Sequence, residues 1–225
     1  MGIGHVALAL GAAKATPRLN VGWLVFAALV SDFLLGIFAL MGLEHASVPP
    51  DYAQRHYLLF TFPYSHGLVP LVLWAAIAGF LISRLSKADR TRVFLVIAAV
   101  VLSHFILDGI VHVAGLPLAG ENSPKLGLGL WNRLPFELSL ETLMAIAGVV
   151  LYLRLAGSGT SSLSRYGMPI YVALVTVLTW TQLFAKTPPN PQQLAPAWVI
   201  VPLVFSALAY GLDRKRARNV AEDRG

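Results

Sequence analysis

The sequence predicts an all-α fold, a polytopic bundle of membrane helices. Of its 225 residues, 56% are hydrophobic and only 12% are charged, which is more apolar than a soluble core of this size requires. Windows of about 20 apolar residues, the length that crosses a bilayer core, occur six times along the chain. No repeat of 20 to 50 residues is visible, so residues 1–225 are expected to form a single integral membrane domain.

The first expected element is shorter than a full span. The run "GIGHVALALGAA" is too brief for a comfortable crossing, so it is expected to be a re-entrant or strongly tilted helix packed against the others. Six transmembrane helices are then expected near residues 21–43, 66–86, 93–115, 137–156, 167–185 and 196–212. The Gly- and Pro-rich stretches between them predict connections or lids.

Basic residues predict which way the helices run. The chain has 17 Lys and Arg residues and a net charge of +6, and in membrane proteins such residues mark the cytoplasmic loops. A serpentine chain leaves four of them outside, Arg55, Lys125, Arg133 and Lys186, and the other 13 inside. The loop at residues 84–92 and the C-terminal "DRKRAR" are therefore expected in the cytoplasm. Topology alone explains the basic charge, so no nucleic-acid partner is expected.

The histidines and acidic residues of the expected spans lie between the middle of the membrane and the opposite, outer side. His5 lies in the short first helix, Asp32 at the middle of its span and His66 at the opening of the next one. The stretch "SHFILDGIVH" carries His104, Asp108 and His112 in the outer half of its helix, and Glu137 with Glu141 starts the following helix at the same level. Uncompensated charge within a membrane is costly, so a shared partner is expected.

The spacing of these residues suits a metal ion. Helix positions four apart differ by about 40° in azimuth and about 6 Å in height, so His104 and Asp108 can hold one ion, and His112 extends the same stripe. Imidazole nitrogen and carboxylate oxygen together favour zinc, with manganese or iron as alternatives. With no cysteine in the chain, a thiolate site is excluded. The remaining alternative is a polar cluster or proton relay joined by interhelical hydrogen bonds.

Four motifs, "GH", "SD", "YSHGL" and "SHFILD", occur in this order. They resemble the predicted membrane-bound metal-dependent hydrolases, a family of bacterial inner-membrane proteins, over residues 1–145. With "PKLGLGLWN" and "LSLE", the chain resembles an uncharacterised subgroup along its whole length, and the order of its motifs is distantly similar to zinc-dependent phospholipase C. The resemblance implies a metal site formed by His5, Asp32, His66, His104 and Asp108. A second Asp after "SD" and a His-Arg-Gly before "YSHGL", common in the family, are absent here.

The leading hypothesis is a membrane-embedded metal-dependent hydrolase in the cytoplasmic membrane, with its site facing outward. The metal would activate water and polarise the scissile group, while Asp32 or Glu141 would act as the catalytic carboxylate that handles the proton. Membrane lipids are the expected partners, and a lipid or lipid-linked phosphoester is the expected substrate. One alternative is a transporter that uses the His and Asp residues for proton or ion coupling. Another is a non-catalytic protein with a degenerate site. The sequence leaves the oligomeric state open.

Overall fold

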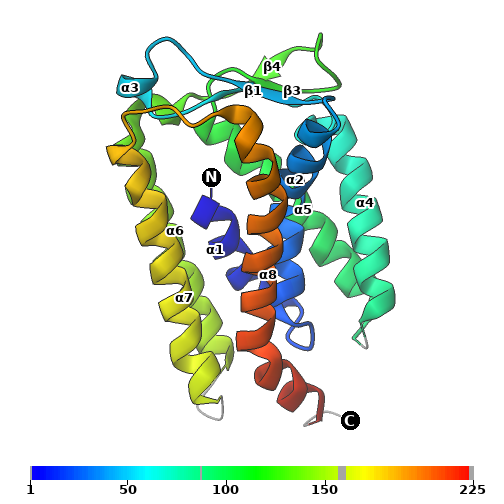
Figure 1. Cartoon of the computed structure of the whole chain (residues 1–225). Coiled ribbons are helices and arrows are strands. Elements are labelled where there is room, and N and C mark those ends of the chain that lie inside the picture. Colours follow the sequence, from blue (N-terminus) through cyan, green and yellow to red (C-terminus); the bar gives the residue numbers. More distant parts are fainter. Residues whose placement is uncertain (1, 87, 157–160, 223–225) are drawn as a thin grey trace.

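The chain folds into a bundle of helices (Figure 1), as predicted. The computed structural model describes residues 2–86, 88–156 and 161–222. Within these residues the α-helices are α1 (Gly2–Ala12), α2 (Val21–Leu40), α3 (Tyr52–Arg55), α4 (Leu68–Leu85), α5 (Arg90–Val111), α6 (Leu134–Ala156), α7 (Ser162–Trp180) and α8 (Pro191–Glu222). Six of them, α2 and α4 to α8, are long and apolar enough to cross a membrane. The predicted all-α bundle of six spans and a short first helix is confirmed.

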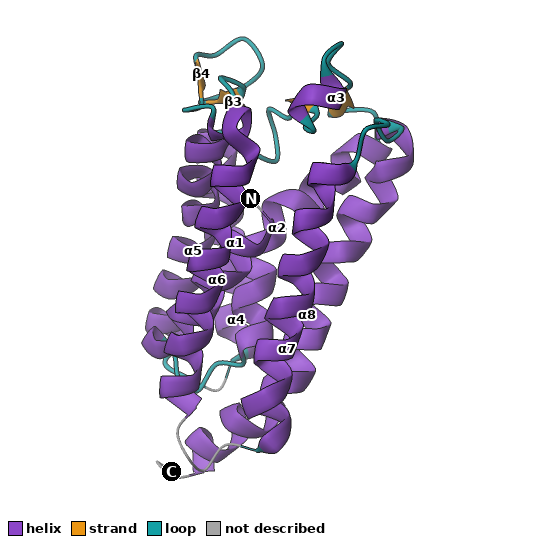
Figure 2. Ribbon diagram, turned by 90° about the vertical axis from the view of Figure 1, so that its left-hand side faces the viewer, coloured by secondary structure: helices purple, strands orange, loops and turns teal. Residues whose placement is uncertain are grey.

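Short elements join the helices. Three 3-10 segments, η1 (Ala13–Ala15), η2 (Leu130–Arg133) and η3 (Thr181–Phe184), extend or precede helices. Two short antiparallel strand pairs were not predicted from the sequence. In them, β1 (His45–Ser47) pairs with β2 (Leu59–Thr61), and β3 (Leu116–Pro117) pairs with β4 (Lys125–Leu126). Both pairs lie at one end of the bundle, here called the hairpin end (Figure 2). The other end, where α4 meets α5 and α8 finishes, is here called the basic end.

Several expected boundaries were wrong by a few residues. The span expected at 66–86 begins at Leu68, so His66 precedes the helix instead of opening it. The span expected at 93–115 ends at Val111, which makes His112 the residue that caps α5. Helices α6, α7 and α8 begin earlier than expected, at Leu134, Ser162 and Pro191, and α8 continues to Glu222. Helices α2 and α7 end earlier than expected, at Leu40 and Trp180. Hydropathy locates the apolar core of a helix, whereas capping groups and loops set its ends.

Helix α1 lies inside the bundle instead of on its surface. Its 11 residues span roughly 16 Å, about half of a bilayer core, and Figure 1 shows it surrounded by the longer helices. Ile3, Val6 and Leu10 are almost completely buried. Close packing on α6 depends on Gly148, because a Cβ there would lie 2.5 Å from the carbonyl oxygen of Ala7. Small residues let helix backbones approach in this way where lipid provides no hydrophobic drive.

The pairing of α2 with α8 depends on glycine in the same way. A Cβ on Gly22 would lie 2.5 Å from the Cβ of Tyr210, and one on Gly36 would lie 2.6 Å from the amide nitrogen of Val199. The two glycines are 14 residues apart, or roughly 21 Å along the helix. Helix α8 therefore packs against most of the length of α2, the helix that carries Asp32.

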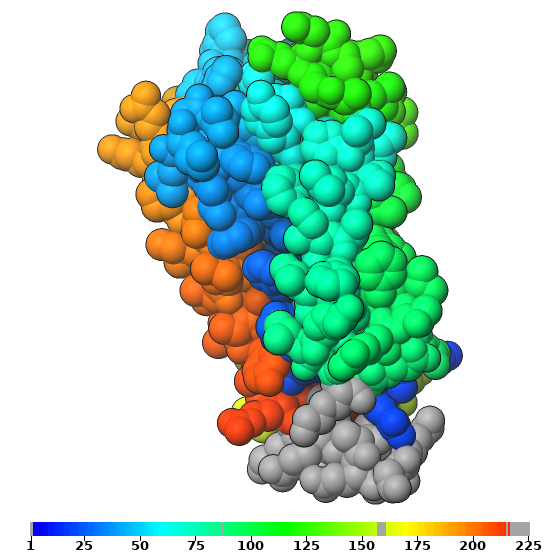
Figure 3. Space-filling view, turned by 90° about the vertical axis from the view of Figure 1, so that its right-hand side faces the viewer, coloured from blue at the N-terminus to red at the C-terminus, as the bar shows by residue number. Residues whose placement is uncertain are grey.

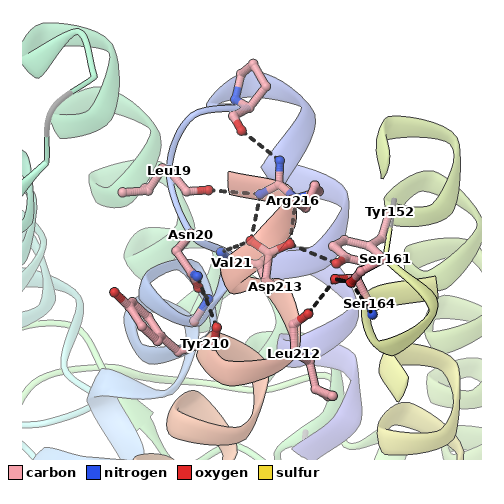
Figure 4. A network of polar contacts seen from close by, with 12 residues as sticks. Leu19, Asn20, Val21, Tyr152, Ser161, Ser164, Tyr210, Leu212, Asp213 and Arg216 are labelled. Atoms are coloured by element: carbon pink, nitrogen blue, oxygen red, sulfur yellow. Dashed lines mark hydrogen bonds and ion pairs between the residues drawn. The ribbon is translucent and has the colours of Figure 1, made fainter. Parts of the chain in front are cut away.

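A buried polar network, here called the clasp, fastens α8 to the loop before α2 at the basic end (Figure 4). Asp213 is completely buried, pairs with Arg216 and accepts hydrogen bonds from the Val21 amide at 2.8 Å and the Tyr152 hydroxyl at 2.8 Å. The Arg216 guanidinium, itself buried, donates to the carbonyl oxygens of Pro17 at 2.7 Å and Leu19 at 3.1 Å. The loop between η1 and α2 is thus held by a residue about 200 positions later.

The outer surface of the bundle is apolar. Figure 3 shows α4 and α5 side by side on one face, and large side chains on α4, among them Val72, Phe80 and Leu81, are more than half exposed. Such an exposed apolar surface is expected where lipid, and not water, is the solvent. The buried ionisable groups described next lie inside this apolar bundle, towards the hairpin end.

Candidate metal centre

His104 and Asp108 form the centre of a cluster on α5. The His104 Nε2 atom lies 3.2 Å from Asp108 Oδ2, and both side chains are buried. This contact confirms that the two residues share one helix face, as their spacing predicted. The Nδ1 atom of His104 donates to the carbonyl oxygen of Ala28 on α2 at 2.7 Å, and a neutral His104 therefore directs its Nε2 lone pair at the cluster.

His66, which lies two residues before the start of α4, also contacts this cluster. Its Nε2 lies 3.2 Å from His104 Nε2 and 3.6 Å from Asp108 Oδ2. Ser65 donates its hydroxyl proton to Glu44 Oε2 at 2.6 Å, so His66 Nδ1 must donate to the Ser65 oxygen at 2.8 Å. Glu44 is fixed in turn, because its other oxygen accepts from the amides of Tyr64 and Ser65 at 2.7 and 2.8 Å.

Two further histidines contact Asp108. His5, brought in by α1, places Nε2 3.1 Å from Asp108 Oδ1, and its ring stacks on that of His104 with centroids 3.9 Å apart. His112, at the end of α5, has Nε2 3.4 Å from Asp108 Oδ2. The structure therefore gathers four histidines around one buried carboxylate, from two helices, α1 and α5, and the loop before α4.

Asp32 on α2 completes the cluster and is its most accessible member. Its Oδ1 lies 3.7 Å from His66 Nε2, and its side chain is 35% exposed, whereas the side chains of His66 and Asp108 are at most 4% exposed. Donor atoms of Asp32, His66 and His104 lie within 4.8 Å of one another, and so do those of His5, His104 and Asp108. The expected convergence of separate helices is confirmed. The partial exposure of the Asp32 side chain also shows that the cluster is not fully enclosed.

The donor atoms are spaced as ligands of one ion would be. A tetrahedral zinc ion with bonds of about 2.0–2.1 Å places its ligand atoms roughly 3.3 Å apart. The separations among His66 Nε2, His104 Nε2 and Asp108 Oδ2 are 3.2, 3.2 and 3.6 Å. Because both Nδ1 atoms carry donated protons, two neutral imidazoles would face each other through lone pairs. A cation or an extra proton between them removes this repulsion, and the residues fit a divalent metal.

A glycine-rich loop closes the hairpin end of α5 beside the cluster. The amides of Leu128 and Gly129 donate to the carbonyl oxygens of Gly109 and His112, both at 2.8 Å. Gly127 makes this approach possible, since its φ is +153° and a Cβ there would lie 2.5 Å from the His112 oxygen. The loop thereby satisfies carbonyl groups that the helix end leaves unpaired and positions Trp131 next to His112.

Aromatic rings cover the cluster on this side. The Trp131 ring lies 3.9 Å from that of His112, and the Phe62 ring lies 4.6 Å from that of His66. The Tyr57 ring stacks on that of Trp131, with centroids 5.4 Å apart. Trp131 therefore packs over the site.

Glu137 and Glu141 lie near the cluster but do not join it. Both are buried on α6, and in the described part of the chain Glu137 Oε2 and both carboxylate oxygens of Glu141 have no hydrogen-bond partner. They line a cavity of about 270 Å³ together with Trp131 and Gly2. Trp131 thus separates this cavity from His112. A role for Glu141 in catalysis stays a prediction.

The other two histidines lie apart. His45 is exposed on β1, and His56 packs its ring near the Ala185 carbonyl oxygen, which its Nδ1 approaches at 3.0 Å. Residues that sequence reasoning missed are Glu44 and Ser65, which orient His66, and Phe62. Only the position of Ser65, directly before a candidate ligand in "YSHGL", could have indicated such a role.

Comparison with known proteins gives no further assignment. No family model, no curated protein and no solved structure matches this chain. What the structure itself establishes is a polytopic bundle of candidate membrane helices with a buried cluster of histidines and aspartates that can hold a metal ion.

Proposed function

We propose that this protein is a membrane-embedded metal-dependent hydrolase. The observation that carries the proposal is the triangle of His66 Nε2, His104 Nε2 and Asp108 Oδ2, whose sides of 3.2, 3.2 and 3.6 Å match the spacing of metal ligands. The resemblance of "GH", "SD", "YSHGL" and "SHFILD" to membrane-bound metal-dependent hydrolases supports the same reading, since these motifs supply the clustered side chains.

His66, His104 and Asp108 would hold the metal, with His5, Asp32 and His112 available to complete its coordination. Nitrogen and carboxylate donors favour zinc over manganese or iron. A bound divalent cation would supply Lewis-acid chemistry, activating water and polarising a scissile bond. Asp32 borders open space, so its carboxylate is the member of the cluster best placed to accept a proton from attacking water. Glu141 is the second candidate for proton transfer, across the cavity beside Trp131.

A lipid or lipid-linked phosphoester is the proposed substrate. Asp32 lies eight residues before the end of α2, or roughly 12 Å below the hairpin end of the helix. Trp131 and Phe62 cover the histidines from the hairpin end, so a substrate already in the membrane has the shorter route to the site. By the positive-inside rule, we expect this end to face the outer side of the cytoplasmic membrane.

Metal analysis of the purified protein tests the proposal at its base. The wild type is expected to carry about one zinc ion per chain by emission spectroscopy, and His104→Ala is expected to carry far less, because the imidazole is a direct ligand. The matched control is His45→Ala, which removes an exposed histidine outside the cluster and should retain the metal.

A second arm tests hydrolysis. Metal-loaded protein is incubated with membrane lipid extract, and products are followed by mass spectrometry; cleavage should require both metal and His104. Absence of stoichiometric metal, with none bound on titration, would overturn the proposal. Solute flux in proteoliposomes that persisted after metal removal would favour the transporter alternative instead.

A further inference from the structure

A second polar pocket lies at the basic end of the bundle, away from the metal centre. It has a volume of about 200 Å³ and is bordered by the loop before α2 and by the first turn of α5. Asp89, which borders it, lies 19 residues before Asp108, so the two sites are roughly 28 Å apart along α5. Nothing in the proposed hydrolysis requires this pocket.

The polar groups around this pocket are mainly anion-binding. Arg18 and Arg92 contribute two permanent positive charges. The one acidic neighbour, Asp89, is already engaged, because its Oδ1 accepts from the amides of Thr91 and Arg92 at 3.0 and 3.2 Å. Two arginines and one aspartate give the described residues that line the pocket a net charge of +1.

The buried Thr16 hydroxyl gives evidence for a ligand that is independent of the arginine charges. This residue lines the pocket and is only 3% exposed, yet its hydroxyl has no hydrogen-bond partner within the described residues. Buried hydroxyl groups are nearly always paired, since leaving one unpaired is unfavourable. A ligand with acceptor oxygens, seated between the two arginines, would satisfy it.

The frame around the pocket is fixed before any ligand arrives. The Thr16 carbonyl oxygen accepts from the Leu19 amide at 2.9 Å, and the carbonyl oxygen of Pro17 accepts from buried Arg216 at 2.7 Å. The clasp therefore holds the loop that presents Thr16 and Arg18, and little ordering is required for binding.

We infer that this pocket binds a phosphate group, through the Arg18 and Arg92 guanidinium groups and the Thr16 hydroxyl. Guanidinium groups match phosphate oxygens in planar, paired hydrogen bonds. Because the pocket lies where α5 begins, at the level of the lipid headgroups, the phosphate can belong to an anionic lipid. A free soluble phosphate has the same chemistry, and the experiment separates the two sources.

The test uses the full chain in detergent and three probes: dioctanoyl phosphatidic acid, inorganic phosphate and uncharged dioctanoylglycerol. Native mass spectrometry and a binding titration follow wild type, Thr16→Val and Arg92→Gln. Each substitution removes one charged or hydroxyl contact and should weaken binding of the phosphate probe roughly tenfold. Thr16→Val preserves side-chain shape, and Arg92 is exposed, so both variants should fold.

The matched control is Arg84→Gln, which removes an exposed arginine at the same end that does not line the pocket. It should bind as the wild type does. Binding of phosphatidic acid alone identifies a lipid headgroup, and competition by inorganic phosphate identifies a soluble ligand. Equal binding by Thr16→Val, Arg92→Gln and wild type would overturn the inference. Binding of dioctanoylglycerol as tight as that of phosphatidic acid, or an equal loss in Arg84→Gln, would do the same.

Discussion

His66 shows how a single residue is prepared for its role. Its ring is held by Ser65, which is held by Glu44, and Glu44 is anchored by two backbone amides. A carboxylate that orients a histidine through a hydroxyl fixes which ring nitrogen is free and increases its basicity. Glu44 therefore acts on the cluster without touching Asp108 or His104.

Ser65→Ala tests this chain of hydrogen bonds. The substitution frees the His66 ring to rotate and leaves buried Glu44 with one fewer partner, so zinc affinity should fall by about 10- to 100-fold. Competition with a chelator of known affinity gives the measurement, and saturating zinc should still load one ion per chain. Ser139→Ala, which alters an exposed serine within α6, is the control. Unchanged affinity in Ser65→Ala would show that Glu44 only stabilises the loop.

Among the helices, α2 is the element on which the arrangement depends. It provides Asp32 and the carbonyl oxygen of Ala28 to the cluster. Its residues Gly22 and Gly36 allow the close approach of α8. Gly36 is one helical turn from Asp32, so the close approach of α8 lies next to the cluster.

Gly36→Ala should disturb that approach. The added Cβ would lie 2.6 Å from the Val199 amide nitrogen, a backbone atom that cannot rotate away, and overpacking of this kind costs roughly 1–3 kcal/mol. The midpoint of thermal unfolding in detergent should fall. Gly211→Ala is the control, since nothing lies within 4 Å of its new methyl group. Equal midpoints for the two variants would mean that α8 shifts without cost.

At this scale the sequence predicts much, and its failures have physical causes. Apolar length predicts the spans, and the four-residue spacing predicts the contact of His104 with Asp108. Those signals are local. The hydrogen bond from Ser65 to Glu44 joins residues 21 positions apart, so no local pattern predicts it. The packing of Trp131 on His112 depends on a positive φ at Gly127. The position of His66 before α4 was missed because hydropathy does not detect where a helix begins.

For the whole molecule, the orientation in the membrane decides which compartment reaches the metal centre. The structure places the α4–α5 connection and the end of α8 together at the basic end (Figure 1), and charge predicts that this end is cytoplasmic.

Because the chain contains no cysteine, single-cysteine variants can test this orientation. Arg90→Cys, at the basic end, should resist an impermeant maleimide in intact cells, while Glu121→Cys, at the hairpin end, should react. Both positions are exposed, so accessibility does not bias the comparison. The reverse labelling pattern would place the hairpin end, and the cluster with it, on the cytoplasmic side.

The clasp should make a large contribution to stability. Arg216→Met removes the ion-pair partner of the completely buried Asp213 carboxylate, and this loss costs roughly 3–5 kcal/mol of stability. The double variant Asp213→Leu/Arg216→Met removes both charges and should be less destabilised than Arg216→Met. Unfolding in mixed micelles measures the difference in stability. Arg214→Met, an exposed neighbour, is the control. Equal losses for the single and double variants would mean that the backbone contacts matter more than the ion pair.

The clasp also bears on the order of synthesis. Ribosomes make residues 17–21 early and Arg216 almost 200 residues later. The carbonyl groups of Pro17 and Leu19 must therefore wait for their donor until all six spans have been made. Before α8 is made, every residue of the cluster has already been translated, but α2 does not yet have α8 packed beside it. Shortening the last helix should therefore expose the first half of the chain, not the last, to the cell's proteases.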